Sequence, residues 1–171
     1  MKTLSLKALA IATAVFASGA ASATPVTPLT ADTGWKSFAF GAVGTYAKKT
    51  YSFTIAGHAI LKLVDGFTSG DRFQVFANNI SRGLTSLPHA GSKIGTKWDL
   101  AFANPNFSHR GFHFGPGTYT ITILVANRAG TDTALHNGAI SLDSSPVPVP
   151  AGGLLLISAL GAAAAAKRRK V

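Results

Sequence analysis

Tyr119-Thr120-Ile121-Thr122-Ile123-Leu124-Val125 decides the fold, because polar and apolar side chains alternate along it. A period of two is that of a β-strand with one face against a core and the other in solvent. Pro116-Gly117 stands just before this stretch. Pro presets φ and Gly accepts positive φ, so the pair predicts a turn at a hairpin-like corner.

Further segments with the same alternation lie on both sides of this strand. They are Ser37–Phe40, Tyr51–Ile55, Ile60–Leu63, Phe73–Ala77, Gly111–Phe114 and Ile140–Leu142. Strands spaced by about ten residues, with no helical stretch between them, predict an all-β domain, an antiparallel β-sandwich or jelly-roll-like fold. Asn78-Asn79 and Asn137-Gly138 predict turns, the second of them a two-residue hairpin turn.

The start of the chain has the pattern of a secretory signal. Met1 to Lys7 contains two lysines, Ala8 to Ala17 is apolar, and Ala21-Ser22-Ala23 supplies small residues before Thr24. Signal peptidase cleaves after such a small-residue triplet. We therefore expect residues 1–23 to be a signal peptide and residues 24–145 to form the β domain.

Residues 146–171 have a three-part pattern. The prolines of Val147-Pro148-Val149-Pro150-Ala151 favour an extended spacer, Gly152 to Ala166 has no charge, and Lys167-Arg168-Arg169-Lys170 follows. A short apolar helix ending in cations predicts a transmembrane segment with its basic stop-transfer tail in the cytoplasm. Because spanning a bilayer takes roughly 20 residues, this shorter run suits a transient anchor.

Two other interpretations also fit residues 146–171. An ordinary C-terminal tail anchor has the same helix and cations, and a basic cluster alone also occurs in nuclear signals and nucleic-acid patches. The position of the cluster directly behind an apolar run favours the membrane, so no nucleic-acid partner is expected.

The segment from Val147 to Lys170 resembles the C-terminal sorting signal of the PEP-CTERM class, in its VPLPA variant. Val149 stands where the motif usually has leucine, and no Glu lies between the prolines. The resemblance implies an exported protein of a Gram-negative bacterium whose partners are signal peptidase and an exosortase-type transpeptidase. It also implies transient tethering to the inner membrane and then the cell surface or extracellular matrix, with exopolysaccharide or an envelope glycan as a contact.

A second resemblance covers Leu63 to Asn79, which is similar to a segment recurring in exported PEP-CTERM proteins, with Ala77 in place of an acidic residue. The stretches from Trp98 to Pro105 and from Gly117 to Ile123 are similar to its downstream part. This resemblance implies an extracellular β domain and carries over no functional residue.

Charge and cysteine content narrow the function classes. The net charge is +10, but of the 16 Lys and Arg two lie in the leader and four in the tail, which leaves ten in the domain against six Asp. The ten are spread without runs, so they predict no nucleic-acid footprint and permit loose affinity for acidic polysaccharide. The chain has no Cys, which excludes thiol catalysis and thiolate metal sites.

Asp65 and Asp71 are the first candidate ligand-binding residues. They flank a turn, with Asn78, Asn79 and Asp99 as possible neighbours, and such oxygen ligands suit Ca²⁺. Asp side chains also form hydrogen bonds with the backbone of their own turns, and this turn-forming role is favoured over calcium binding. No cofactor is therefore expected, with calcium kept as an alternative.

Trp35 and Trp98 are the second pair of candidates, because indole rings on a β-sandwich surface can stack on sugars. Tyr46, Phe67 and Phe107 also lie in or beside predicted turns. The alternative is that these rings fill the core, where aromatic side chains contribute most to stability.

His109 and His113 would share one strand face, as half of a metal site or as surface residues. His58, His89 and His136 stand alone in the sequence. No nucleophile elbow, metalloprotease helix, phosphate loop or dinucleotide fingerprint is found. The sequence thus predicts a non-catalytic exported surface or matrix protein. The alternatives are a calcium-dependent or carbohydrate-binding module and a small secreted hydrolase using the Asp pair.

Overall fold

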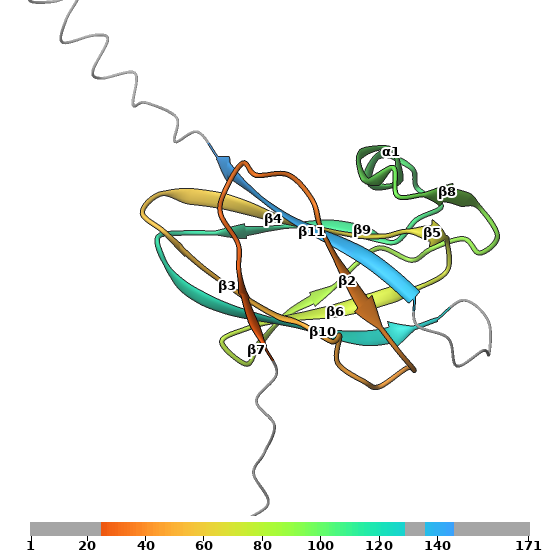
Figure 1. Ribbon diagram of the computed structural model, residues 1–171, viewed down its shortest axis with the longest axis horizontal. Coiled ribbons are helices and arrows are strands. Elements are labelled where there is room, and N and C mark those ends of the chain that lie inside the picture. The colour runs from red at the N-terminus through yellow and green to blue at the C-terminus, as the bar shows by residue number, and fades with distance from the viewer. Residues whose placement is uncertain (1–24, 129–135, 146–171) are drawn as a thin grey trace, which may run out of the picture.

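The computed structural model describes residues 25–128 and 136–145, and these form two β-sheets that face each other (Figure 1). The five-stranded sheet has the order β1-β3-β10-β6-β7 and is antiparallel except for its β1–β3 pair. Its strands are β1 (Val26–Pro28), β3 (Thr50–Ile55), β10 (Gly117–Asn127), β6 (Arg72–Ala77) and β7 (Ile80–Leu84).

The four-stranded sheet has the order β2-β11-β4-β9 and is antiparallel throughout. Its strands are β2 (Lys36–Phe40), β11 (His136–Ser145), β4 (His58–Asp65) and β9 (His109–Phe114). The last strand in the chain, β11, therefore lies between the first strand of this sheet and β4.

Side chains from the inner faces of both sheets form one core. Along β10 the buried residues are Ile121, Ile123 and Val125, and Thr122 and Leu124 between them lie half-buried on the opposite face. They meet Leu61 of β4 and Phe112 of β9 in the same cluster. The alternation in the sequence thus corresponds to one strand face that packs in the core and one that faces outward. The prediction of an all-β, sandwich-like domain is confirmed.

A second, smaller cluster covers the outer face of the four-stranded sheet. It is built by α1 (Trp98–Ala103) and by a two-stranded sheet of β5 (Phe67–Thr68) and β8 (Lys93–Gly95). Ala101 of α1 and Phe107 pack on Val64 and Ala139. Figure 1 shows α1, β5 and β8 gathered at one end of the sandwich. The expectation of no helix was wrong, because this six-residue helix is too short to show a helical period.

Every segment predicted as a strand lies in one. Asn78 and Asn79 make the β6–β7 turn with positive φ of 50° and 63°, as predicted. The predicted corner is at Pro116, in the bend between β9 of one sheet and Gly117, the first residue of β10 in the other, so it joins two sheets and is not a hairpin. The prediction of a hairpin turn at Asn137-Gly138 was wrong.

Asn137 and Gly138 lie inside β11, and at Gly138 the neighbouring strands are too close for any side chain. A Cβ on Gly138 would stand 2.6 Å from Cζ of Phe38 and 2.9 Å from the carbonyl oxygen of Val64. The glycine therefore serves packing and not a turn.

The predicted signal peptide, the proline-rich spacer, the apolar segment and the basic tail lie outside the described residues. Within residues 25–128 and 136–145, no helix has the length and hydropathy needed to cross a membrane.

Candidate functional site

The structure brings Asp65 and Asp71 together at the end of β4, and it adds His136 from the start of β11. Both carboxylates are buried, at 0% and 1% exposure. Nδ1 of His136 lies 2.9 Å from Oδ2 of Asp71. Asp65, Asp71 and His136 together are called the buried cluster, which contains two buried carboxyl groups and one partly buried imidazole.

Asp65 holds the turn that connects β4 to β6. Its Oδ1 accepts a hydrogen bond from the backbone N–H of Gly66 at 2.8 Å, and its Oδ2 accepts from Gly70 and Asp71 at 3.1 Å each. The pKa of Asp65 is raised to about 8, first by burial and then by the nearby Asp71, while the three backbone donors act to lower it. The carboxyl group thus organises its own turn.

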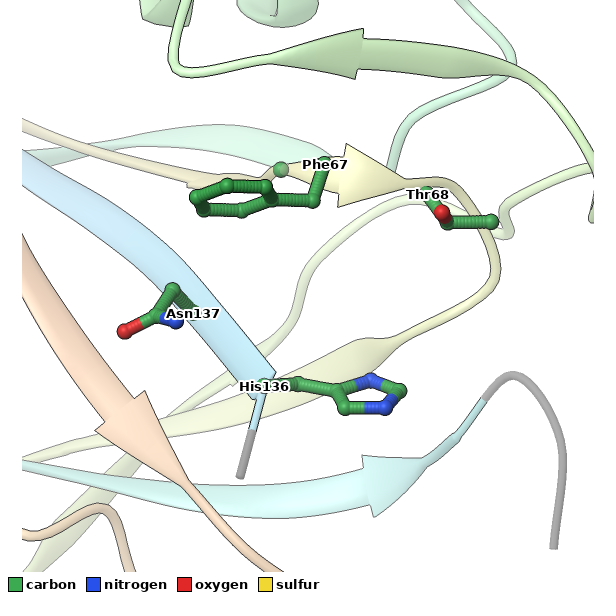
Figure 2. A pocket seen from close by; sticks show the side chains of 5 residues that line it. Phe67, Thr68, His136 and Asn137 are labelled. Carbon is green, nitrogen blue, oxygen red and sulfur yellow. The ribbon is translucent and has the colours of Figure 1, made fainter. Parts of the chain in front are cut away.

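A pocket of ≈ 230 Å³ opens beside the cluster and is lined by Gly66, Phe67, Thr68, His136 and Asn137. Figure 2 shows Phe67 and Thr68 on β5, with His136 and Asn137 at the start of β11. Phe67 has a positive φ of 57°, an uncommon conformation for a bulky residue, and is 44% exposed. Sequence reasoning did not find His136, because 65 positions separate it from Asp71 and no spacing rule links them.

The arrangement does not fit a calcium site. Ca²⁺ takes six or more oxygen ligands, and both oxygens of Asp65 already accept backbone N–H bonds. Asn78 donates to the carbonyl of Thr118 and accepts from the N–H of Thr120, so it braces the β6–β7 turn. Asp99 accepts a bond from Trp35. In the described ranges, no three His, Asp or Glu side chains are grouped to hold a metal ion.

Trp35 and Trp98 lie in the smaller cluster over the four-stranded sheet, and both are half-buried. Nε1 of Trp35 donates to Oδ1 of Asp99 at 2.8 Å, and its ring lies 5.7 Å from that of Phe102. Trp98 packs over Gly66 and edge-on to Phe67. These contacts give both tryptophans a packing role in attaching α1.

Tyr46 is the more open aromatic residue, at 56% exposure. It borders a pocket of ≈ 310 Å³ on the five-stranded sheet, together with Lys49, Thr50, Asn79 and Thr122. An accessible ring beside amide, hydroxyl and ammonium groups has the composition of a sugar-binding surface. Phe107, in contrast, is fully buried.

His109 and His113 share a face of β9, as predicted, but they have different neighbours. Nδ1 of His109 lies 2.8 Å from the carbonyl oxygen of Phe107, and its ring packs 5.2 Å from Phe102. His113 is exposed and lines a separate pocket with two arginines.

No protein-family model and no curated protein matches the chain. Among solved structures, it is similar to the pre-peptidase C-terminal domain of a collagenase from Bacillus anthracis, at 12% identity and a TM-score of 0.37. That match covers 70% of this chain and 93% of the other.

Proposed function

We propose that this chain is an exported, non-catalytic β-sandwich protein that acts at the cell surface or in the exopolysaccharide matrix. The C-terminal pattern from Val147 to Lys170 carries the proposal, since a rigid spacer, an apolar run and a basic cluster in that order suit a sorting signal. An exosortase-type transpeptidase and signal peptidase are its processing partners. The domain then acts by being held at the surface or in the matrix, where a high effective concentration raises the avidity of weak contacts.

The chemistry of the buried cluster supports a non-catalytic role. A hydrolase needs a nucleophile or acid beside a substrate cavity, with its proton acceptor in reach. Asp65 is committed to three backbone donors, and the hydroxyl of Ser69 donates to the carbonyl oxygen of His89 at 2.6 Å. These polar groups stabilise loops.

The intact mass of the protein from envelope and medium fractions of its native host tests this proposal. We expect a species that begins at Thr24 and ends near Ala151, and added mass on the new C-terminus would identify an attached glycan. A species in the inner membrane that retains Lys167 to Val171 would overturn the proposal in favour of a tail-anchored periplasmic domain.

Carbohydrate binding is the second candidate function, and the pocket beside Tyr46 favours it. An exposed ring stacks on a sugar face, while Asn79 and Lys49 offer hydrogen bonds to hydroxyl groups. Titration of the full chain with neutral glucans tests this function, with Tyr46→Ala as the variant and Trp98→Phe as the control. Binding that survives Tyr46→Ala would exclude this pocket.

A further inference from the structure

Two arginines connect the edge strands of the two sheets, β7 and β9, on one side of the sandwich. Arg82 of β7 donates from Nη2 to the carbonyl oxygen of His113 at 2.8 Å. Arg110 of β9 donates from Nη1 to the carbonyl oxygen of Leu84 at 2.8 Å. Each guanidinium thus reaches across to the opposite sheet.

Aromatic rings fix both guanidinium groups. Arg82 lies 4.7 Å over the ring of Phe114, and Arg110 lies 5.0 Å over that of Phe112. Gly83 permits this approach, because a Cβ there would stand 2.9 Å from Nη1 of Arg110 and its φ is +103°. Each guanidinium has five N–H donors, so one bond to a carbonyl leaves most of them for another acceptor. The two cations are held in place before any ligand arrives.

A shallow pocket of ≈ 350 Å³ surrounds the two arginines, and its other lining residues are Ser81, Gly111, Phe112 and His113. In the described part of the chain, neither guanidinium lies within ion-pair distance of a carboxylate.

The described aspartates are engaged elsewhere. Asp143 pairs with Lys62, Asp71 with His136, Asp99 with Trp35, Asp32 with Ser144, and Asp65 with its own turn. The two positive charges are therefore available to an anion from outside, and the planar fork of arginine suits carboxylate oxygens in particular.

We infer that the pocket of Arg82, Arg110 and His113 binds the carboxylate groups of an acidic polysaccharide, an inference that rests on the proposed function. The pocket is open along a sheet edge, so an extended chain can pass through it with one uronate between the arginines. Phe112 is the one apolar side chain of its lining, and it is 4% exposed under the guanidinium of Arg110, so the pocket offers little apolar surface to a membrane.

Calorimetric titration of the full chain in a non-ionic detergent with a short oligogalacturonate tests the inference. Binding should weaken as salt is added, because screening reduces the attraction between exposed charges. His113→Glu places a carboxylate in the lining of the pocket that both arginines share, and it removes neither cation–π contact. We expect it to weaken binding at least about tenfold, the loss expected for a charge-assisted hydrogen bond.

His89→Glu is the matched control, since it makes the same charge change on an exposed histidine that does not line this pocket. It should keep wild-type affinity. Thermal melting of each variant separates loss of the site from loss of the fold. A second variant, Arg110→Lys, keeps the charge and removes the planar fork, and should also weaken binding.

Equal affinity of His113→Glu and the wild type would overturn the inference, as would binding to phosphatidylglycerol vesicles but not to oligogalacturonate. The proposed function stands or falls separately on the intact mass from cell fractions. A processed matrix protein that ignores oligogalacturonate refutes only the pocket, and an unprocessed inner-membrane chain refutes the proposed function.

Discussion

Asp65 is a carboxyl group whose burial and whose hydrogen bonds act in opposite directions on its charge. Removal from water favours the protonated form, and the three backbone N–H donors favour the carboxylate. Its pKa of about 8 lies well above the ordinary value of 3.8, so burial and the repulsion from Asp71 prevail. The free energy of unfolding must therefore depend on pH through this residue.

The sign follows from proton counting. Between about pH 4 and pH 8 the folded chain holds a proton on Asp65 that the unfolded chain has released, so Asp65 makes the protein less stable as pH rises. The slope is at most about 1.4 kcal/mol per pH unit. Asp65→Asn should flatten this part of the profile in urea unfolding at several pH values. Asp143→Asn is the control and should keep the slope, whereas an unchanged profile in Asp65→Asn would contradict the assignment.

Gly66 shows how closely one residue is packed under α1. A Cβ at this position would overlap the indole ring of Trp98, so the tryptophan lies on bare backbone. Gly66→Ala should therefore lower the free energy of unfolding by about 1–3 kcal/mol through overpacking. Gly57→Ala, with no heavy atom within 4 Å, should change it by less than about 0.5 kcal/mol. Equal effects of the two variants in denaturant unfolding would contradict this packing.

At the scale of one element, substitutions in β10 test whether its two faces differ in burial as the structure assigns them. Ile123 is fully buried between the sheets, and Thr122 beside it faces outward. Ile123→Ala should cost about 2–5 kcal/mol, from lost burial and the cavity left behind. Thr122→Ala should cost less than about 1 kcal/mol, mainly through lower β propensity. Chemical unfolding of both variants checks the ratio, and comparable losses would mean that the assigned register is wrong.

Most of the strands that the sequence predicted are those whose burial alternates; β11 is the exception, with every residue from Gly138 to Leu142 buried. In β10 and β6 each inward residue is apolar and each outward residue is polar or half-buried, so a period of two is visible without the fold. In β7 the pattern is absent, because its edge position leaves Ile80 and Ser81 exposed alike. The short α1 is held by contacts of Ala101 and Trp98 with distant residues, which no local pattern records.

The candidate site was predictable only in part. Asp65 and Asp71 are close in sequence, and Asp chemistry at a turn is a local signal. His136 joins them because β11 aligns antiparallel to β4, with Gly138 opposite Asp65, and that register depends on the whole sheet. Arg82 and Arg110 meet only because β7 and β9 are edges on the same side of the sandwich.

At the scale of the whole molecule, the four-stranded sheet depends on β11, the last described strand in the sequence, which lies between β2 and β4. β11 pairs with β2 on one side and with β4 on the other, and it contributes Ile140 and Leu142 to the core. Until β11 is in place, β2 has no neighbour in this sheet among the described strands. The sandwich is therefore built from contacts far apart in sequence, which folds more slowly than local structure.

This topology yields a prediction about truncation. A chain from Thr24 that ends at residue 135 should lose cooperative thermal unfolding, because β2 and β4 are separated and the core opens on one side. A chain that ends at Ser145 should melt within about 2 °C of the full chain, since it keeps every described strand. Circular dichroism melting distinguishes the two, and cooperative unfolding of the shorter chain would contradict the central role of β11.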